Sequence, residues 1–520
     1  MTYADWIARY DTLTPERHEA LQQSSARPLI SILIPVYNPA LQFLAAAIAS
    51  VEQQIYENWE ICLADDASTD PEVRPFLEER SRSERRIRLL LRESNGHISA
   101  CSNSALALAR GEWCALLDQD DALAEDAFAE VAAEIGRHPD AGIIYSDEDF
   151  IDAAGTRSNP FFKPDWNPEL FLGQNYLNHL GVYRTALLRD VGGFREGFEG
   201  SQDYDLALRC IARLRGEQIR HIPRLLYRWR MLEGSLADAP NAKPYARLAA
   251  RHALNSHLQA RRIAARAEAC PENQESHRVI YDVPNPLPPV TIVTGIREPD
   301  WVRQSAGDVA LEIILAGPGA SELNAAAKRA RGEVLIFLSG EILSAEPGWL
   351  VEMISHVVRP EVGAVGARLW SPAGKLEDGG LILGLGGIAA PAFRGVPRGH
   401  PGYFNRAWLQ QNYSAVSGVC LAVRREIFLQ LDGFDETNLP RNFFDIDFCL
   451  RLRSSGRQVI WTPYANFVFG GSGLREEAQS PAEASYLQQR WRDQLLADPF
   501  YNPNLSLVPP DFTLANPPRS

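Results

Sequence analysis

The most informative stretch of the chain is Ala115-Leu116-Leu117-Asp118-Gln119-Asp120-Asp121, in which an apolar run ends in three carboxylates. The apolar half predicts the end of a buried strand. Three neighbouring negative charges repel one another unless a hard divalent cation such as Mg²⁺ or Mn²⁺ binds them. A metal held by one or two carboxylates keeps positions open for phosphate oxygens. A solvated turn or a helix cap is the alternative interpretation of the same run.

Composition limits the classes of protein to consider. With 520 residues, 45% of them hydrophobic, the chain is long enough for more than one domain. The net charge of −14 makes a nucleic-acid partner unfavourable. The seven cysteines are scattered without a Cys-x-x-Cys pair, which is typical of a reduced, cytoplasmic protein without structural zinc.

We expect neither a secretory signal nor a membrane-spanning segment in this sequence. Residues 1–20 are polar and charged, so we expect no signal peptide. An uninterrupted run of 18 apolar residues is absent from the sequence, so we expect any membrane association to be peripheral.

The first half of the chain alternates strand and helix patterns. Buried strands are expected at residues 29–35, 59–64, 88–91 and 113–117, with a helix over 41–52 between the first two. This alternation predicts an α/β fold with a mostly parallel sheet, and such sheets bind ligands at the carboxyl ends of their strands. The polar clusters that follow these strands are therefore expected to converge on one edge: Pro35, Tyr37 and Asn38; Asp65 and Asp66; Asn95; Asp118 and Asp120.

Residues 1–27 predict a helical lead-in. Trp6, Ile7, Tyr10 and Leu13 recur at helical spacing, and Thr14-Pro15-Glu16 is typical of the start of a second short helix. We expect this segment to pack on the domain that follows, and a membrane-surface helix is the alternative.

Several motifs occur in one order along residues 28–237. They are PVYN, DDASTD, SNGHISACSNSALALARGE, LLDQDD, YSDEDFID, GSQDYDLALR and HIPRLLYRWR. In this order they resemble the family-2 glycosyltransferases of GT-A fold, and most closely those of bacterial O-antigen and surface polysaccharide assembly. The resemblance implies a nucleotide-sugar donor of the UDP or dTDP type and a saccharide or lipid-linked saccharide acceptor.

The resemblance also implies roles for single residues. Asp120 and Asp118 would bind Mn²⁺ or Mg²⁺, and Asp118 would also face the ribose. The donor nucleotide would contact Pro35, Tyr37, Asn38, Asp65, Asp66, Arg92, Asn95, Asn103 and Asp118. Two alternatives stay open here: an Asx turn of Asp65 with Ser68 and Thr69, and an ordinary turn at Asn95-Gly96.

Asp203 is the expected general base, since in this family the carboxylate at its position deprotonates the acceptor hydroxyl and the sugar is transferred with inversion. Asp205 and Arg209 are four residues apart, which favours a structural ion pair. The resemblance implies acceptor binding or closure of the site by Asp147, Glu148, Trp229 and Arg230. A solvated turn is the alternative for Asp147 and Glu148.

The second half repeats the first. Asn324 to Val334 echoes Asn103 to Trp113 at a constant separation of 221 positions. Asp445-Ile446-Asp447 likewise echoes Asp203-Tyr204-Asp205. The resemblance therefore extends to a second GT-A-like domain.

This second copy departs from the family pattern in three places. Ala316-Gly317-Pro318-Gly319 stands where the base-binding carboxylates are expected, Ser339-Gly340-Glu341 replaces the metal motif, and Phe469-Gly470-Gly471-Ser472 replaces a late segment that carries histidines in relatives. We therefore expect a degenerate domain without catalysis. Core packing or an acceptor surface are the alternatives for its aromatic residues, Trp370, Phe393, Tyr403, Phe404, Trp408 and Tyr413.

The sequence thus predicts a lead-in (1–27), a catalytic domain (28–237), a helical connector (238–284), a degenerate domain (285–499) and a proline-rich extended tail (500–520). Wrapping around the second domain and disorder are both open for this tail. The expected activity is that of a metal-dependent inverting glycosyltransferase, cytoplasmic and peripheral at the inner face of the membrane. A bifunctional transferase and a non-catalytic saccharide-binding or assembly protein are the alternatives.

Overall fold

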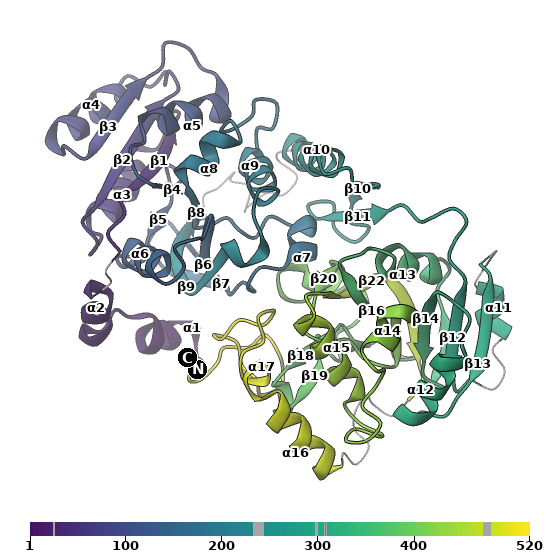
Figure 1. The fold of residues 1–520 in the computed structure, drawn as a ribbon. Helices are drawn as coiled ribbons and strands as arrows, with labels where there is room; N and C mark the ends of the chain where they lie inside the picture. Colours follow the sequence, from purple (N-terminus) through teal and green to yellow (C-terminus); the bar gives the residue numbers. More distant parts are fainter. Residues whose placement is uncertain are drawn as a thin grey trace. The chain divides into compact units, whose positions relative to one another are not determined.

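The computed structural model describes residues 1–23, 26–231, 244–296, 300–305, 307, 309–471 and 480–519. The chain clusters into two compact units (Figure 1). The first unit comprises Met1–Trp166, Asn175–Ile263 and Asn516–Pro518. The second unit comprises Asn167–Gln174, Ala264–Ala515 and Arg519–Ser520.

The first unit is built on a mixed sheet in which β1 runs parallel to β2 and β4, and β8 runs antiparallel to β4. In spatial order its strands are β3 (Ile87–Leu91), β2 (Trp59–Asp65), β1 (Ile30–Val36), β4 (Trp113–Leu116), β8 (Gly181–Arg184), β6 (Ile143–Ile151), β9 (Ile219–Arg230) and β5 (Ala122–Leu123), with β7 (Arg157–Phe161) paired to β6. The four strands and the 41–52 helix expected from the sequence are confirmed to within one residue at each end.

Helices cover both faces of this sheet (Figure 1). One face packs α3 and α6 into the main apolar core through Leu44, Ile48, Phe128 and Val131, while α5 and α9 lie on the other face. The helical segments of the first unit are α1 (Tyr3–Trp6), η1 (Ile7–Asp11), α2 (Pro15–Gln22), α3 (Leu41–Glu52), α4 (Val73–Ser83), α5 (His97–Leu108), α6 (Ala127–Arg137), α8 (Thr185–Asp190), α9 (Gln202–Ile211), η2 (Gly216–Gln218) and α10 (Pro244–Ala260).

The second unit repeats the strand order of the first. Its sheet runs β13 (Leu311–Leu315), β12 (Val290–Thr294), β14 (Val334–Leu338), β21 (Cys420–Arg424), β16 (Val362–Trp370), β22 (Gln458–Phe469) and β15 (Ile342–Ala345), with β17 (Leu376–Asp378) on β16 and β20 (Gln411–Asn412) on β22. Here β12 takes the place of β1, and β14, β21 and β16 take those of β4, β8 and β6. The α/β architecture with two tandem GT-A-like sheets is therefore as expected.

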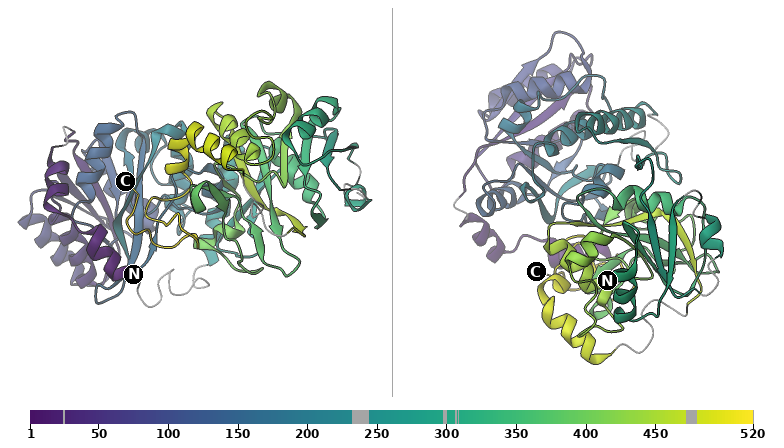
Figure 2. Two further views of the ribbon diagram at one scale, coloured as in Figure 1. Left: turned by 90° about the horizontal axis from the view of Figure 1, so that it is seen from below. Right: turned by 45° about the vertical axis from the view of Figure 1, so that its right-hand side comes forward.

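Helices also cover both faces of the second sheet (Figures 1 and 2). Trp349 and Met353 of α13 join the apolar core of one face, and α15 contacts β16 and β22 from the other. The helical segments are α7 (Pro168–Gly173), α11 (Asp300–Ser305), α12 (Ala320–Arg329), α13 (Trp349–Val357), η3 (Leu385–Gly387), η4 (Tyr403–Trp408), α14 (Arg425–Gln430), α15 (Phe444–Ser454), α16 (Pro481–Arg490) and α17 (Arg492–Leu496); a strand pair, β18 (Leu381–Leu383) and β19 (Ala389–Pro391), lies beside them.

One block of the first unit has no counterpart in the second. In the first unit β2 leads through α4 and β3 to α5, whereas residues 316–319, all of them described, connect β13 directly to α12. The described part of the second sheet therefore ends at β13, without an equivalent of β3. Three of the residues expected to contact the donor nucleotide, Asp66, Arg92 and Asn95, belong to this block of the first unit.

A buried polar network is repeated between the units. In each unit a hydroxyl on the central strand donates to a glutamate of the next strand at 2.7 Å and accepts from a glycine N–H at 2.8 Å. The three residues are Ser31, Glu60 and Gly111 in the first unit and Thr291, Glu312 and Gly332 in the second. The framework is thus duplicated down to individual hydrogen bonds.

The expected helical connector is only partly correct. Within residues 238–284 the structure has α10, and then an antiparallel pair of β10 (Ala265–Ala269) and β11 (His277–Tyr281). Alternation of buried and exposed side chains in this pair, with Ala267 and Val279 buried, is the period-2 pattern that the Ala- and Arg-rich composition masked. The expected boundary at 237/238 lies in residues 232–243, outside the described residues.

The lead-in and the tail are both packed. Trp6 is buried with its ring 5.2 Å from that of Phe162, and α2 begins after Thr14, whose hydroxyl accepts from the N–H of Arg17. In the tail Tyr501 and Leu505 are buried, so residues 500–515 pack as part of the second unit.

Candidate active site

The loop after β4 carries the acidic cluster, and Gln119 fixes it to the loop after β1. The Gln119 side chain accepts from the N–H of Tyr37 at 2.9 Å and donates to its carbonyl at 3.3 Å. The Asp118 side chain is 50% exposed. Tyr37 is itself exposed, so its ring offers a stacking surface.

Asp121 anchors the loop to β9. It is buried and accepts from the hydroxyl of Tyr227 at 2.6 Å and from the N–H of Arg230 at 2.7 Å. Burial, and then the charge of Asp118, raises the pKa of Asp121 to about 8. Arg230 also donates to the carbonyl of Asp120 at 2.7 Å, so this arginine supports the acidic loop from β9.

His179 faces the acidic loop and was not found from the sequence. Its Nε2 lies 3.9 Å from Asp118 Oδ2, and its Nδ1 lies 3.2 Å from Glu148 Oε2. Its ring stacks on Tyr227 at 4.6 Å. Burial lowers the pKa of His179, but the hydrogen bond and charge of Glu148 outweigh it and raise this pKa to about 9. The residue sits in an irregular segment before β8, where periodicity gives no signal.

The acidic run in β6 is buried, which corrects the expectation that Asp147 and Glu148 meet an acceptor. Asp147 accepts from the N–H of Lys163 at 2.8 Å and lies 2.9 Å from His221 Nε2. Glu148 accepts from the N–H of His179 at 2.7 Å. Asp147 and Glu148 are both buried, so their charges must be paired inside the protein. Neither the acceptor role nor a solvated turn fits this burial.

Asp203 lies in the first turn of α9 and is only partly buried. Its Oδ2 accepts from the side-chain amides of Asn175 at 2.9 Å and Asn178 at 2.5 Å. Asn178 immediately precedes His179, so one short segment touches both Asp203 and the acidic loop. The expected Asp205–Arg209 ion pair is present at 2.8 Å.

At the edge next to β2, the expected donor-binding carboxylates have partners inside the protein. Asp65 accepts from the N–H and hydroxyl of Ser68, which is the Asx-turn alternative. Asp66 forms an ion pair with Arg92 at 2.7 Å and accepts from the N–H of Gly96 at 3.0 Å. These contacts hold the loop after β2 in place and connect it to the loop before α5.

Two residues expected to contact the donor, Asn38 and Asn95, hydrogen-bond to backbone groups of the loops around them. Asn38 accepts from the N–H groups of Thr69 and Asp70 at 2.8 and 3.2 Å. Asn95 donates to the carbonyl of Asp66 at 3.3 Å and accepts from the N–H of His97 at 3.2 Å.

Asn103 makes contacts within the framework, which favour a structural role over the donor contact expected from the sequence. Its amide donates to the carbonyl of Phe194 at 2.7 Å and accepts from the N–H of Phe194 at 2.8 Å. Asn324 makes the same pair of bonds to Phe434 at 2.9 Å in the second unit. A contact present in both units belongs to the framework.

The acidic loop suits a metal that also binds a ligand. Within the described ranges, no group of three or more His, Cys, Asp or Glu side chains is placed to hold a metal ion by itself. Asp118 and Asp120 offer oxygen donors in a loop where the side chain of Asp118 is half exposed. Such a donor set fits Mg²⁺ or Mn²⁺ completed by phosphate oxygens.

The equivalent edge of the second unit lacks these groups. In the first unit Ala115 of β4 pairs with Val182 of β8, and in the second Ile336 of β14 pairs with Ala422 of β21. Val182 and Ala422 are therefore equivalent, and the residues three positions before them, His179 and Val419, are equivalent too. Asp445 is retained, but a backbone N–H, that of Gly418, donates to it at 2.7 Å. Ser472, the last residue of the altered late segment, lies outside the described residues.

Comparison with known proteins agrees with this geometry. Residues 31–191 match the family model of glycosyl transferase family 2. The chain is 40% identical to the uncharacterized protein y4gI of Sinorhizobium fredii, over 98% of this chain and 61% of that protein. It is 34% identical to the O-antigen biosynthesis protein RfbC of Myxococcus xanthus, over 99% of this chain and 43% of that protein. The chain thus spans about half the length of these relatives.

Solved structures are more distant. The S. aureus TarS fragment 1–349 in complex with UDP-GlcNAc is 22% identical, with a TM-score of 0.35, over 44% of this chain and 72% of that one. The mannosyltransferase PcManGT from Pyrobaculum calidifontis, in complex with GDP-Man and Mn²⁺, is 16% identical with a TM-score of 0.32, over 49% of this chain and 79% of that one.

The first unit thus contains the segment that matches glycosyl transferase family 2, and its sheet and acidic loop agree with that match. A second unit with the same strand order follows the first along the chain. None of the helices in the described ranges is both long and apolar enough to cross a membrane.

Proposed function

We propose that the protein is a metal-dependent, inverting glycosyltransferase with a single catalytic unit, the first. It would take a sugar from a UDP- or dTDP-type donor and pass it to a saccharide or lipid-linked saccharide in bacterial surface polysaccharide or O-antigen synthesis. The observation that carries the proposal is the segment 175–180, which joins Asp203 to the acidic loop of Asp118 and Asp120.

Donor binding would use the edge formed by β1, β2 and β4. The Asp65 and Asp66 loops would meet the base, and Tyr37 would offer its exposed ring. Asp118 and Asp120 would hold Mn²⁺ or Mg²⁺, which when bound neutralises the diphosphate of the leaving nucleotide. Gln119 and Arg230 keep this loop in place through the bonds described above.

Asp203 would act as the general base. The acceptor hydroxyl oxygen forms a bond to the anomeric carbon while its proton passes to the Asp203 carboxylate. The bond from the anomeric carbon to the diphosphate oxygen breaks, and the nucleoside diphosphate leaves with that electron pair. One displacement from the opposite side inverts the anomeric configuration. The two asparagine amides on Oδ2 hold the carboxylate in position for this transfer.

Acceptor contact is proposed for Trp229 and for the surface around His179, in place of Asp147 and Glu148. The Trp229 ring lies 5.5 Å from that of His179 and is partly exposed. The second unit would stabilise the protein or bind acceptor without catalysis. A cytoplasmic protein, peripheral at the inner membrane face, would have access to a lipid-linked acceptor.

The test is release of nucleoside diphosphate from UDP-, dTDP- and GDP-sugars, with Mn²⁺ or with EDTA. We expect one base class to be consumed, and only with metal. Equal turnover in EDTA would contradict the metal role, and turnover that survives Asp203→Asn would contradict the proposed base.

A further inference from the structure

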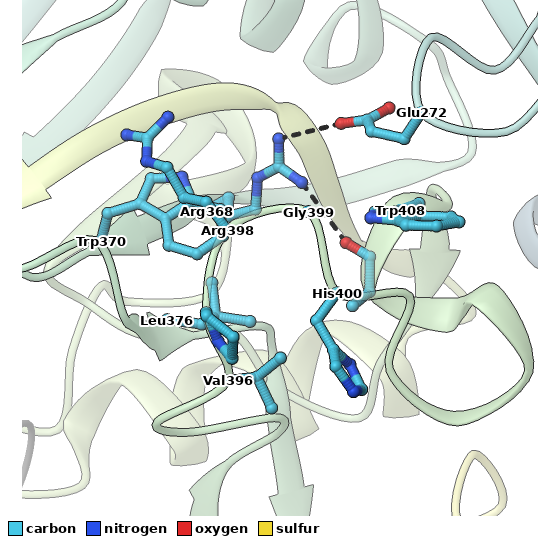
Figure 3. A pocket seen from close by; sticks show the side chains of 11 residues that line it. Glu272, Arg368, Trp370, Leu376, Val396, Arg398, Gly399, His400 and Trp408 are labelled. Atoms are coloured by element: carbon cyan, nitrogen blue, oxygen red, sulfur yellow. Dashed lines mark hydrogen bonds and ion pairs between the residues drawn. The ribbon is translucent and has the colours of Figure 1, made fainter.

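The second unit contains a pocket outside the site described above (Figure 3). Its volume is about 110 Å³. It is lined by two tryptophans, two arginines, a histidine, a glutamate and a small apolar wall: Trp370, Trp408, Arg368, Arg398, His400, Glu272, Leu376, Val396, Pro397, Gly399 and Ala407.

The pocket lies at the carboxyl end of β16, where the first unit has the end of β6. Leu369 pairs with Phe467 in the second unit as Phe150 pairs with Trp229 in the first. In α/β sheets this end of the strands is where ligands bind. The pocket therefore occupies a binding position of the fold, although the carboxylates for a nucleotide are missing from the second unit.

The charged groups around the pocket balance one another. Arg368 contacts Glu272 at 3.4 Å, as Figure 3 shows, and Arg398 forms an ion pair with Glu346 at 2.8 Å. Each cation thus has its own carboxylate, so little net positive charge is left to bind a phosphate or a carboxylate. Paired donors and acceptors suit a ligand whose groups both donate and accept, which is the property of hydroxyls.

The aromatic groups supply the remaining surface. Trp370 is buried and fixed, since its indole N–H and Arg368 Nε both donate to the side-chain oxygen of Asn466, at 2.8 and 2.7 Å. Trp408 is only partly buried and borders the opening with His400 (Figure 3). The volume is below the range of about 300 to 1,000 Å³ typical of pockets for drug-sized ligands, which limits the occupant to one small ring.

We propose that this pocket binds a single neutral pyranose ring, a hexose unit of the acceptor glycan. Its identification as acceptor rests on the proposed function; the binding of a neutral sugar does not. The second unit would then hold a sugar of the growing chain while the first unit performs the transfer.

The experiment is saturation-transfer difference NMR on the full chain. The probes are the methyl glycosides of glucose, galactose, mannose and N-acetylglucosamine, with methyl glucuronide as an anionic comparison. We expect binding of at least one neutral glycoside and a loss of affinity of at least about tenfold in Trp408→Ala. Glu272→Gln, which keeps the shape of the side chain, should also weaken binding. Trp301→Ala, a partly buried tryptophan of α11 that does not line the pocket, is the matched control and should bind like wild type.

Near-ultraviolet circular dichroism of each variant verifies that its fold is kept. Absence of binding by every glycoside, or neutral binding that is unchanged in both folded pocket variants, would overturn the proposal. Stronger binding of the glucuronide than of the neutral sugars would overturn the assignment to a neutral ring. Nucleotide-induced stabilisation, measured on the same samples, reports on the first unit, so a failure of the proposed function would be seen separately.

Discussion

The two units of this chain share a framework and differ in their sites. Both have the same strand order and the same hydroxyl–glutamate–glycine network. Both also have an ion pair between an aspartate and the arginine four residues later, Asp205–Arg209 on α9 and Asp447–Arg451 on α15. The second lacks the α4–β3 block, has Ser339 and Glu341 where the first has Asp118 and Asp120, and has Val419 in place of His179. Contacts found in both units therefore identify residues that hold the fold. Groups found only in the first identify candidates for the chemistry.

The largest difference between the units is expected for the paired carboxylates Asp203 and Asp445. Asp203→Asn should lower the transfer rate by about 10²- to 10⁴-fold, since it removes the general base but keeps a similar shape. Asp445→Asn should leave the rate unchanged. Initial rates at saturating donor measure both effects. Equal losses in the two variants would favour two active units.

A second pair of variants should behave alike. Asp205 pairs with Arg209, and Asp447 pairs with Arg451, each with the arginine also bound to two backbone carbonyls. Asp205→Ala and Asp447→Ala should each destabilise their own unit by about 3 to 5 kcal/mol, because a largely covered arginine loses the buried carboxylate that pairs with it. Urea unfolding curves give these values. If only one of the two variants lost stability, the two aspartate–arginine ion pairs would not be equivalent.

A smaller, also symmetric effect is expected at Asn103 and Asn324. Replacing either by alanine leaves a backbone N–H and carbonyl of Phe194 or Phe434 without their partner, at a cost of about 1 to 3 kcal/mol. Donor affinity should not change in Asn103→Ala. A weakened donor affinity with normal stability would restore Asn103 to the site.

Much of this comparison was visible in the sequence. The constant separation of 221 positions revealed the repeat, and the apolar runs located the strands, because both signals are local. The loss of the base-binding carboxylates at 316–319 was also evident, although the structure adds that a whole helix and strand are missing.

What the sequence could not reveal depends on tertiary pairing. His179 lies 61 positions from Asp118 in the chain, and only the fold brings its Nε2 to 3.9 Å from the Asp118 carboxylate. Asp147 and Glu148 resemble exposed acids, yet Lys163 and His221 neutralise them within β6. The two bonds of Asn103 to Phe194 join residues 91 positions apart. In β10 and β11, the Ala- and Arg-rich composition of the chain favoured a helix. The structure instead has two antiparallel strands, whose pairing the local sequence does not show.

The central claim is that a donor nucleotide binds the first unit through its acidic loop. Thermal shift with UDP, dTDP and GDP, with and without Mn²⁺, should be measured on wild type, Asp120→Asn and the matched Glu341→Gln. We expect one nucleotide to stabilise wild type and Glu341→Gln by about 2.7 kcal/mol at a hundredfold excess over its dissociation constant, only with Mn²⁺, and not to stabilise Asp120→Asn. Stabilisation that survives Asp120→Asn, or that is lost in Glu341→Gln, would contradict the account.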